Sequence, residues 1–186
     1  MLWLAPSVMS VPKIRCLVAV AALGIACSDP YGTEPAPKTE TAPQVASVPI
    51  ATAPSNGFGE EIRWEPFDDG LARAKAQGLP IMMVVHAGWC PRCKELKPSF
   101  SDSTLTALSR SFVMVNVDAD AEPRSQQPPY TPDGDYIPRV MFVDAKTGEV
   151  DATLVNARRT QSRYFYTPAD DLLAVMQRAL SRHEST

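Results

Sequence analysis

The run Pro80-Ile-Met-Met-Val-Val-His86 is followed directly by Ala87-Gly-Trp-Cys-Pro-Arg-Cys93. A short, continuous apolar run rich in β-branched residues is typical of a strand that is buried on both faces of a sheet. The next residues, Lys94-Glu-Leu-Lys-Pro98, favour a helix that Pro98 kinks or ends. The two cysteines are therefore predicted to lie where a buried strand gives way to the N-terminus of a helix.

This placement predicts a redox-active cysteine pair. Backbone N–H groups and the helix dipole stabilise a thiolate at a helix N-terminus, and the thiolate is the form that attacks a substrate disulfide. Cys90 is the predicted nucleophile, and Cys93, one turn further on, is the predicted resolving thiol. Arg92 adds a positive charge near both sulfurs, so we expect it to lower the pKa of Cys90 and to raise the reduction potential.

Three other uses of the cysteine pair stay open. A structural zinc site usually needs four ligands, and the chain offers no second cysteine pair near the motif and only the two histidines His86 and His183. A purely structural disulfide would close a very short loop and add little stability. Delivery of a soft ion such as copper(I) would need more thioether or imidazole ligands than His86 alone. We therefore expect neither a metal nor a cofactor.

The order of strands and helices expected in the rest of the domain predicts an α/β architecture with a central mixed β-sheet flanked by helices. Asp68 or Asp69 can cap a first helix that Gly78 ends, and Ser103 can cap a second. Thr167 is the expected cap of the last helix, with a proline at its first position. The predicted helices cover 68–77, 94–98, 103–110 and 167–180, the strands 80–86, 112–117, 139–143 and 149–155, and a long proline-rich loop 119–137.

The N-terminal part reads as an export signal. Lys13 and Arg15 precede the apolar run Leu17-Val-Ala-Val-Ala-Ala-Leu-Gly-Ile-Ala26, a pattern typical of a secretory signal peptide. The run ends in Leu23-Gly-Ile-Ala-Cys27, which resembles a bacterial lipobox, so residues 1–27 are predicted to be a signal peptide and Cys27 a lipidated first residue. Ordinary cleavage near Ala26, with Cys27 incidental, is the alternative.

Composition separates a linker from a domain. Residues 28–57 are rich in Pro, Thr, Ala and Ser, which favours a disordered spacer, and residues 58–186 hold the predicted domain. The chain has 186 residues, with 18 Lys and Arg against 21 Asp and Glu. That balance argues against a protein that binds the nucleic-acid backbone, which would usually be strongly basic.

Taken together, these segments resemble the thioredoxin superfamily. They are most similar to the small endoplasmic-reticulum thioredoxin-like proteins, namely thioredoxin domain-containing protein 12 and the anterior gradient proteins. The resemblance implies a thioredoxin-like fold, thiol–disulfide exchange, and a cis Ile137–Pro138 bond that faces the sulfurs and offers backbone groups to a substrate strand. It also implies that Trp89 lies beside the motif and shapes substrate access. The segments that carry the resemblance are 78–86, 89–100, 112–116, 132–144 and 164–166, and the similarity covers residues 78–180.

The chain departs from the superfamily pattern in one chemically important place. Thioredoxins bury an acid six residues before the nucleophile, where this chain has Val84. His86 could partly substitute in taking a proton from the resolving thiol, although a packing role is the simpler interpretation. The anterior gradient proteins lack a complete cysteine pair, whereas this chain has one.

The expected function is that of an exported thiol–disulfide oxidoreductase. Its expected partners are protein thiols and disulfides, a redox partner protein or glutathione, and a membrane through a lipid anchor. The chain ends in Arg182-His-Glu-Ser-Thr186, which is not a retention signal of the Lys-Asp-Glu-Leu type. We therefore expect the periplasmic side of a bacterial envelope, with secretion or the endoplasmic-reticulum lumen as alternatives. The alternative function is a binding or chaperone module without redox turnover, with loop 119–137 as its contact surface.

Overall fold

The computed structural model describes residues 51–185. The predicted signal peptide, Cys27 and the predicted linker up to residue 50 lie outside the described residues. Within residues 51–185, the helices are all too short or too polar to cross a membrane.

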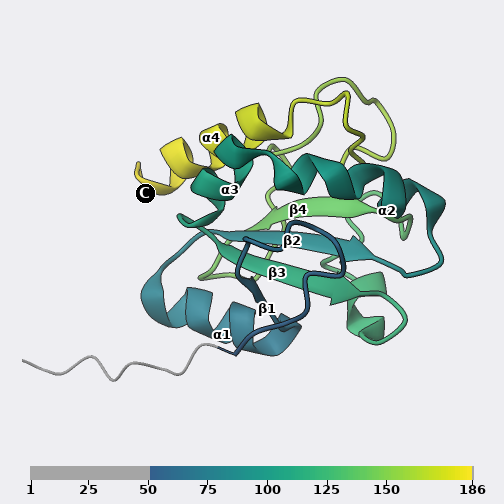
Figure 1. The fold of residues 1–186 in the computed structure, drawn as a ribbon. Coiled ribbons are helices and arrows are strands. Elements are labelled where there is room, and N and C mark those ends of the chain that lie inside the picture. Colours follow the sequence, from purple (N-terminus) through teal and green to yellow (C-terminus); the bar gives the residue numbers. More distant parts are fainter. Residues whose placement is uncertain (1–50, 186) are drawn as a thin grey trace, which may run out of the picture. The chain divides into compact units, whose positions relative to one another are not determined.

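A four-stranded sheet lies at the centre of the fold, in the order β1-β3-β2-β4 (Figure 1). Strands β1 and β2 each run parallel to β3, whereas β4 runs antiparallel to β2, so the predicted mixed sheet is confirmed. The two central strands are the buried apolar runs, as parallel strands covered on both faces require. The strands are β1 (Trp64–Glu65), β2 (Ile81–His86), β3 (Val113–Asp118) and β4 (Arg139–Val143).

Helices cover both faces of this sheet. Figure 1 shows α1 on one face and α2, α3 and α4 on the other. Two 3-10 turns complete the fold, η1 directly after α2 and η2 within the predicted long loop. The helical elements are α1 (Phe67–Gln77), α2 (Pro91–Leu96), η1 (Lys97–Ser101), α3 (Ser103–Ser109), η2 (Pro123–Gln126) and α4 (Leu172–His183).

Side chains along β2 alternate between the two faces of the sheet, and one of these faces carries the cysteines. Val84 belongs to the same core cluster as Cys90 and Cys93, on the face covered by α2, α3 and α4. Met83 and Val85 belong to the second core cluster, on the face covered by α1. Because side chains two apart share a face of a strand, the residue that follows Val84 on the cysteine side is His86.

The predicted fourth strand at 149–155 is wrong. Val150 forms only an isolated antiparallel bridge with Val143, so no β-hairpin is built. The Asp151 backbone N–H donates to Phe142, and the Asp151 carboxylate accepts from the Thr153 backbone N–H at 2.7 Å. This turn around Asp151 directs the chain away from β4 after a single pair of residues.

The predicted start of the last helix is also wrong. Helix α4 begins at Leu172, where Asp171 accepts from the Ala174 backbone N–H at 2.9 Å. The carboxylate of Asp170 instead accepts from the N–H and the hydroxyl of Thr167, both at 2.8 Å. The sequence offers adjacent aspartates, and one closes a turn while the next caps the helix.

The predicted caps of two other helices are wrong. Helix α1 begins at Phe67 behind Pro66, with no side-chain cap from Asp68 or Asp69. Helix α3 is capped by Asp102, which accepts from two backbone N–H groups, rather than by Ser103. The predicted end of α1 at Gly78 is confirmed, since Gly78 adopts a left-handed conformation with φ of 64°.

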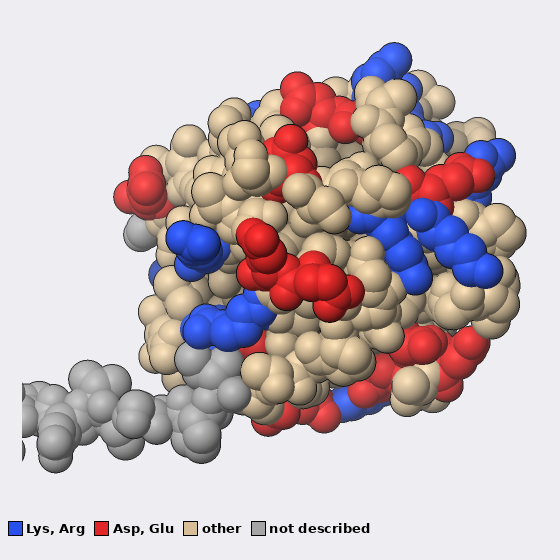
Figure 2. All heavy atoms as spheres, viewed as in Figure 1, with Lys and Arg blue, Asp and Glu red and all other residues tan. Residues whose placement is uncertain are grey.

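Charged side chains of both signs are interspersed over the face of the molecule in Figure 2. No broad, uniformly basic surface is visible on that face, which agrees with the near balance of charges in the sequence. This face thus gives no support to a polyanion-binding role.

Candidate active site

Cys90 and Cys93 lie at the junction between β2 and α2, as predicted. They form a disulfide with Cα atoms 5.3 Å apart, and their exposed fractions are only 3% and 0%. Cys90 is the N-cap of α2, and the Cys93 backbone N–H donates to the Cys90 sulfur at 3.1 Å. Pro91 occupies the first helical position, where the absence of an N–H has no cost. After reduction, the same N–H is placed to stabilise a Cys90 thiolate.

A cis-proline turn faces the Cys90 sulfur. The Ile137–Pro138 peptide bond is cis, as the family resemblance implied, and the Ile137 carbonyl oxygen lies 3.9 Å from the Cys90 sulfur. The loop leading to this turn contains a second cis bond, between Pro128 and Pro129, which was not predicted. The Cys90 sulfur and the backbone of this turn therefore lie next to each other.

Trp89 is the exposed aromatic neighbour of Cys90. Its side chain is 66% exposed, and it is the one large exposed hydrophobic residue among residues 51–185. The indole N–H donates to the Asp120 carboxylate at 2.9 Å, which fixes the ring from the loop that follows β3. An exposed but oriented aromatic ring is suited to contact an apolar side chain of a partner.

Arg92 does not lie as an unpaired charge beside the sulfurs. Its guanidinium forms an ion pair with Glu95 at 2.7 Å, and both side chains are at least half exposed. Pairing and solvent screening weaken the field that this cation exerts on Cys90. The predicted effect of Arg92 on the cysteine pKa stays a prediction, and the structure reduces its expected size.

His86 is buried, with an exposed fraction of 2%, and its imidazole Nε2 lies 2.6 Å from the Asn116 Oδ1. The Asn116 amide nitrogen donates to the Ser55 carbonyl at 2.7 Å, which assigns Oδ1 to the histidine side. His86 therefore carries its proton on Nε2. Its Nδ1 is a buried acceptor without a hydrogen-bond partner in the described part of the chain.

The pKa of His86 lies below its ordinary value. Burial is the main cause, because it penalises the charged imidazolium, and the nearby Lys97 charge acts in the same direction. The hydrogen bond with Asn116 and the charge of Asp118 oppose the effect without reversing it. The ring is thus held neutral on the face of β2 that carries the cysteines.

The last residues of the predicted linker cover this histidine. The Ala53 N–H donates to the Trp64 carbonyl at 2.8 Å, and the Asn56 amide nitrogen lies 3.3 Å from the His86 Nε2. The ring of Phe58, which follows directly, packs on the His86 ring with centroids 5.0 Å apart. Residues 53–57, here called the N-terminal strap, are therefore part of the site rather than of a free spacer.

Two site residues could not be predicted from sequence. Asn116 reaches His86 from the neighbouring strand β3, 30 positions along the chain. Arg139, which follows the cis-proline, is completely buried and binds backbone carbonyls of the preceding loop. Neither residue belongs to a local motif, because both depend on contacts that the fold creates.

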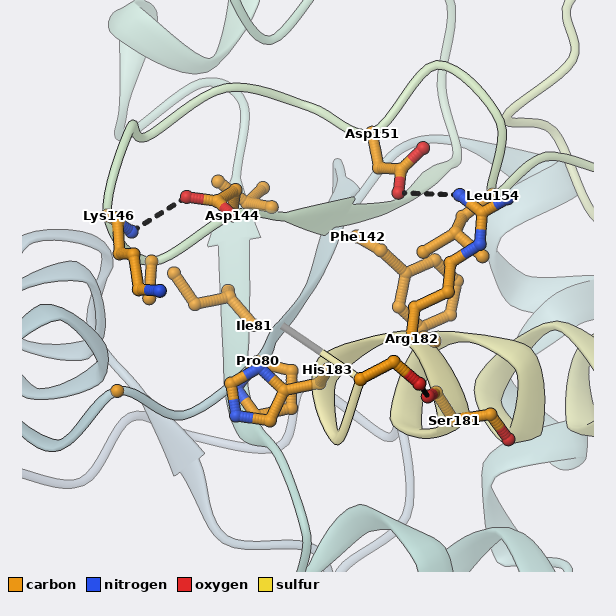
Figure 3. A pocket seen from close by; sticks show the side chains of 15 residues that line it. Pro80, Ile81, Phe142, Asp144, Lys146, Asp151, Leu154, Ser181, Arg182 and His183 are labelled. Carbon is orange, nitrogen blue, oxygen red and sulfur yellow. Dashed lines mark hydrogen bonds and ion pairs between the residues drawn. The ribbon is translucent and has the colours of Figure 1, made fainter.

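A cavity of about 740 Å³ lies away from the cysteines. It is lined by Pro80 and Ile81 at the start of β2, whereas Cys90 follows the end of that strand. Figure 3 shows these apolar side chains between the Asp144–Lys146 turn and the Asp151–Arg182 pair. The cavity is therefore separate from the redox site.

Within residues 51–185 there is no cluster of three metal-ligating side chains.

Comparisons with known proteins agree with this geometry. Residues 63–145 match the family model described as "Thioredoxin-like". The chain is 34% identical to anterior gradient protein 3 of Xenopus tropicalis over 120 residues, which cover 62% of this chain and 69% of that protein. It is 27% identical to the human anterior gradient protein 2 homolog over 172 residues, covering 90% and 93% of the two chains.

Among solved structures, a solution structure of a thioredoxin from Thermus thermophilus is 21% identical, with a TM-score of 0.49 and coverage of 67% of this chain and 92% of that one. The family membership of this chain rests on the sequence relatives and the family model. A thioredoxin-like fold with a cysteine pair at the β2–α2 junction indicates a disulfide oxidoreductase. This chain is a member of the thioredoxin superfamily, close to the anterior gradient proteins.

Proposed function

We propose that the protein is an exported thiol–disulfide oxidoreductase that acts on cysteine-containing proteins of the cell envelope. The observation that carries the proposal is the Cys90–Cys93 disulfide, whose nucleophilic sulfur faces the carbonyl of a cis-proline turn. The turn supplies backbone groups for an extended peptide, and the disulfide supplies the chemistry.

In the oxidising direction, a client thiolate attacks the Cys90 sulfur. A client–Cys90 disulfide forms, the Cys90–Cys93 bond breaks, and Cys93 leaves as a thiolate that takes up a proton. A second thiolate of the same client then attacks the client sulfur of the mixed disulfide. A disulfide within the client forms, the client–Cys90 bond breaks, and Cys90 leaves as a thiolate. Two electrons pass from the client to the cysteine pair, and the reducing direction is the same sequence reversed.

The surrounding residues have separate roles in this cycle. The Cys93 N–H stabilises the Cys90 thiolate, and the backbone of Ile137 and Pro138 aligns the client. Trp89 contacts the client beside its cysteine. In the reducing direction, His86 takes the proton that Cys93 must lose before it attacks. Its Nδ1 is an acceptor without a partner among the described residues, and alternation along β2 places the side chain on the cysteine side of the sheet. Val84 occupies the position of the acid that would otherwise serve.

The proposed location follows from the sequence. Export depends on residues 1–27, and a lipid on Cys27 would hold the domain at a membrane through the spacer that follows. We place the domain on the periplasmic side of a bacterial envelope, where a protein thiol pair or glutathione would restore the cysteine pair.

The decisive experiment uses two serine variants of the purified protein. Cys90→Ser should abolish disulfide exchange with a disulfide-bonded peptide. Cys93→Ser should instead accumulate a mixed disulfide between Cys90 and the peptide, visible as a mass increase that dithiothreitol removes. If Cys90→Ser exchanges as fast as the unaltered protein, or no mixed disulfide forms, the proposal fails.

The reduction potential of the Cys90–Cys93 pair fixes the direction of electron flow. A glutathione titration followed by thiol alkylation measures it. A value near roughly −270 mV corresponds to a thioredoxin-like reductase, and one near roughly −120 to −180 mV to an oxidase or isomerase.

One observation favours a second candidate, a binding or chaperone module without turnover. The Cys90 side chain is only 3% exposed in the disulfide form. If Cys90 also resists alkylation in the reduced, folded protein, the cysteine pair is inaccessible to clients and this second function is the better one. Rapid alkylation of Cys90 alone excludes it.

A further inference from the structure

The structure contains a completely buried arginine beside the cis-proline turn. Arg139 has an exposed fraction of 0% and follows Pro138 directly as the first residue of β4. In the described part of the chain its guanidinium forms no ion pair with a carboxylate, and all its hydrogen-bond acceptors are uncharged. Asp133 and Asp135 act on the guanidinium through space, without contact. A buried charge with no carboxylate in contact is costly, so a role for Arg139 must offset that cost.

The guanidinium joins two segments to the start of β4. One terminal nitrogen, Nη1, donates to the Tyr136 carbonyl at 2.5 Å, and the other, Nη2, donates to the Ser125 carbonyl at 2.6 Å. The side-chain oxygen of Gln126 lies 3.4 Å from both nitrogens. Arg139 thus ties the η2 turn to the residue that immediately precedes Ile137.

These contacts bear on the substrate-binding turn rather than on the sulfurs. In β4, Val140 belongs to the core cluster of the cysteines and Met141 to the opposite one. By alternation, Arg139 points to the α1 side of the sheet, away from Cys90. Its effect must therefore pass through the backbone of residues 136–138, whose Ile137 carbonyl faces the Cys90 sulfur at 3.9 Å.

Arginine is suited to this task for a geometric reason. Its planar fork presents several donors in fixed directions, so one side chain can bind two carbonyls from segments that are far apart in sequence. Lysine would bring one compact ammonium group on a flexible stem and could not hold both carbonyls in the same way. An apolar residue would leave the Ser125 and Tyr136 carbonyls buried without a partner.

We propose that Arg139 is a positioning residue that holds the Ile137–Pro138 turn in the conformation required to bind an extended peptide. The inference rests on the proposed oxidoreductase function. It adds that recognition of protein clients depends on Arg139. Exchange with a small disulfide does not need the turn and is therefore independent of Arg139.

The test compares a disulfide-bonded peptide with glutathione disulfide as substrates for Arg139→Met and Arg139→Lys. For Arg139→Met we expect the KM for the peptide to rise about tenfold, while kcat/KM for glutathione disulfide stays within about twofold. Arg139→Lys, which keeps the charge, should also raise the KM for the peptide and leave exchange with glutathione disulfide unchanged, but the rise should be smaller. This variant replaces Arg139→Met in the test if Arg139→Met does not fold.

Arg73→Met is the matched control, because Arg73 is the other buried arginine of the described residues and pairs with Glu65 on α1 and β1. It should lower stability without changing the ratio of peptide to glutathione activity. The inference is overturned if the Arg139 variants lose both activities in parallel, if they lose neither, or if Arg73→Met changes the ratio equally. If the unaltered protein exchanges with neither substrate, the proposed function has failed instead.

Discussion

The His86 imidazole Nε2 donates to the Asn116 Oδ1 across 2.6 Å, which leaves Nδ1 as a buried acceptor without a partner in residues 51–185. This pair joins β2 to β3 beneath the N-terminal strap, and it defines a neutral imidazole on the cysteine side of the sheet.

The neutral His86 should make the fold sensitive to acid. Its pKa is lowered by burial from 6.5, so below that pH the unfolded chain binds a proton that the folded chain does not. Stability is therefore lost as pH falls from 6.5 towards the lower folded pKa. We expect His86→Gln, which keeps a donor at the Nε2 position but cannot titrate, to make the loss shallower in urea unfolding at several pH values. His183→Gln, on the exposed last turn of α4, is the control, and an unchanged slope in His86→Gln would contradict the expectation.

The buried ion pair between Glu65 and Arg73 should be important for stability. Two guanidinium nitrogens of Arg73 bind the two carboxylate oxygens of Glu65 at 2.7 and 2.5 Å, and both side chains are at least 94% buried. Arg73→Met leaves Glu65 with only Arg63 at 3.9 Å. We expect the free energy of unfolding to fall by about 3 to 5 kcal/mol, measured with urea.

A second substitution tests the cause. Glu65→Leu combined with Arg73→Met removes both charges and should recover a large part of the loss. Arg124→Met, which breaks an exposed cluster with Asp68 and Glu122, should have a much smaller effect. A double variant no more stable than Arg73→Met would show that packing, not the unpaired charge, is responsible.

Gly70 sets how closely α1 approaches β3. A Cβ at this position would lie 2.6 Å from the Val115 Cγ2, so the helix or the strand would have to move. Alanine favours a helix over glycine by about 1 kcal/mol, but overpacking costs about 1 to 3 kcal/mol. We expect Gly70→Ala to be destabilising overall in thermal unfolding, and to be less so in combination with Val115→Ala. Gly88→Ala, where nothing lies within 4 Å, is the control, and a stabilised Gly70→Ala would refute the steric argument.

Trp89 should matter for clients and not for folding. Because the ring is 66% exposed, Trp89→Ala should leave the midpoint of unfolding nearly unchanged. Loss of one aromatic contact of about 1.4 kcal/mol would raise the KM for a disulfide-bonded peptide about tenfold. Asp120→Asn, which weakens the hydrogen bond that orients the ring, should give a smaller increase. Equal KM values for Trp89→Ala and the unaltered protein would remove Trp89 from the client-binding surface.

The core of the fold could be predicted because its signals are local. Two apolar runs gave β2 and β3, and the cysteine spacing placed the pair at the start of α2. The cis state of Ile137–Pro138 came from the family resemblance, because proline alone leaves both isomers open.

The unpredicted parts depend on competition or on long-range contacts. Asp170 and Asp171 are both good caps, and only the turn with Thr167 decides between them. The contact between Asn116 and Ser55 joins residues 61 positions apart, so no local pattern could place the N-terminal strap over His86. Arg139 looked like the first residue of a strand, and its role depends on where the preceding loop returns.

The isolated bridge at Val150 has a consequence for assembly. Strand β4 is at the end of the sheet order, where exposed N–H and C=O groups could pair with another chain. Here the Val140 N–H donates to Tyr164, and Phe142 accepts from Asp151. Two irregular segments thus occupy hydrogen-bonding positions of this border, which protects the domain against strand-to-strand aggregation on that side.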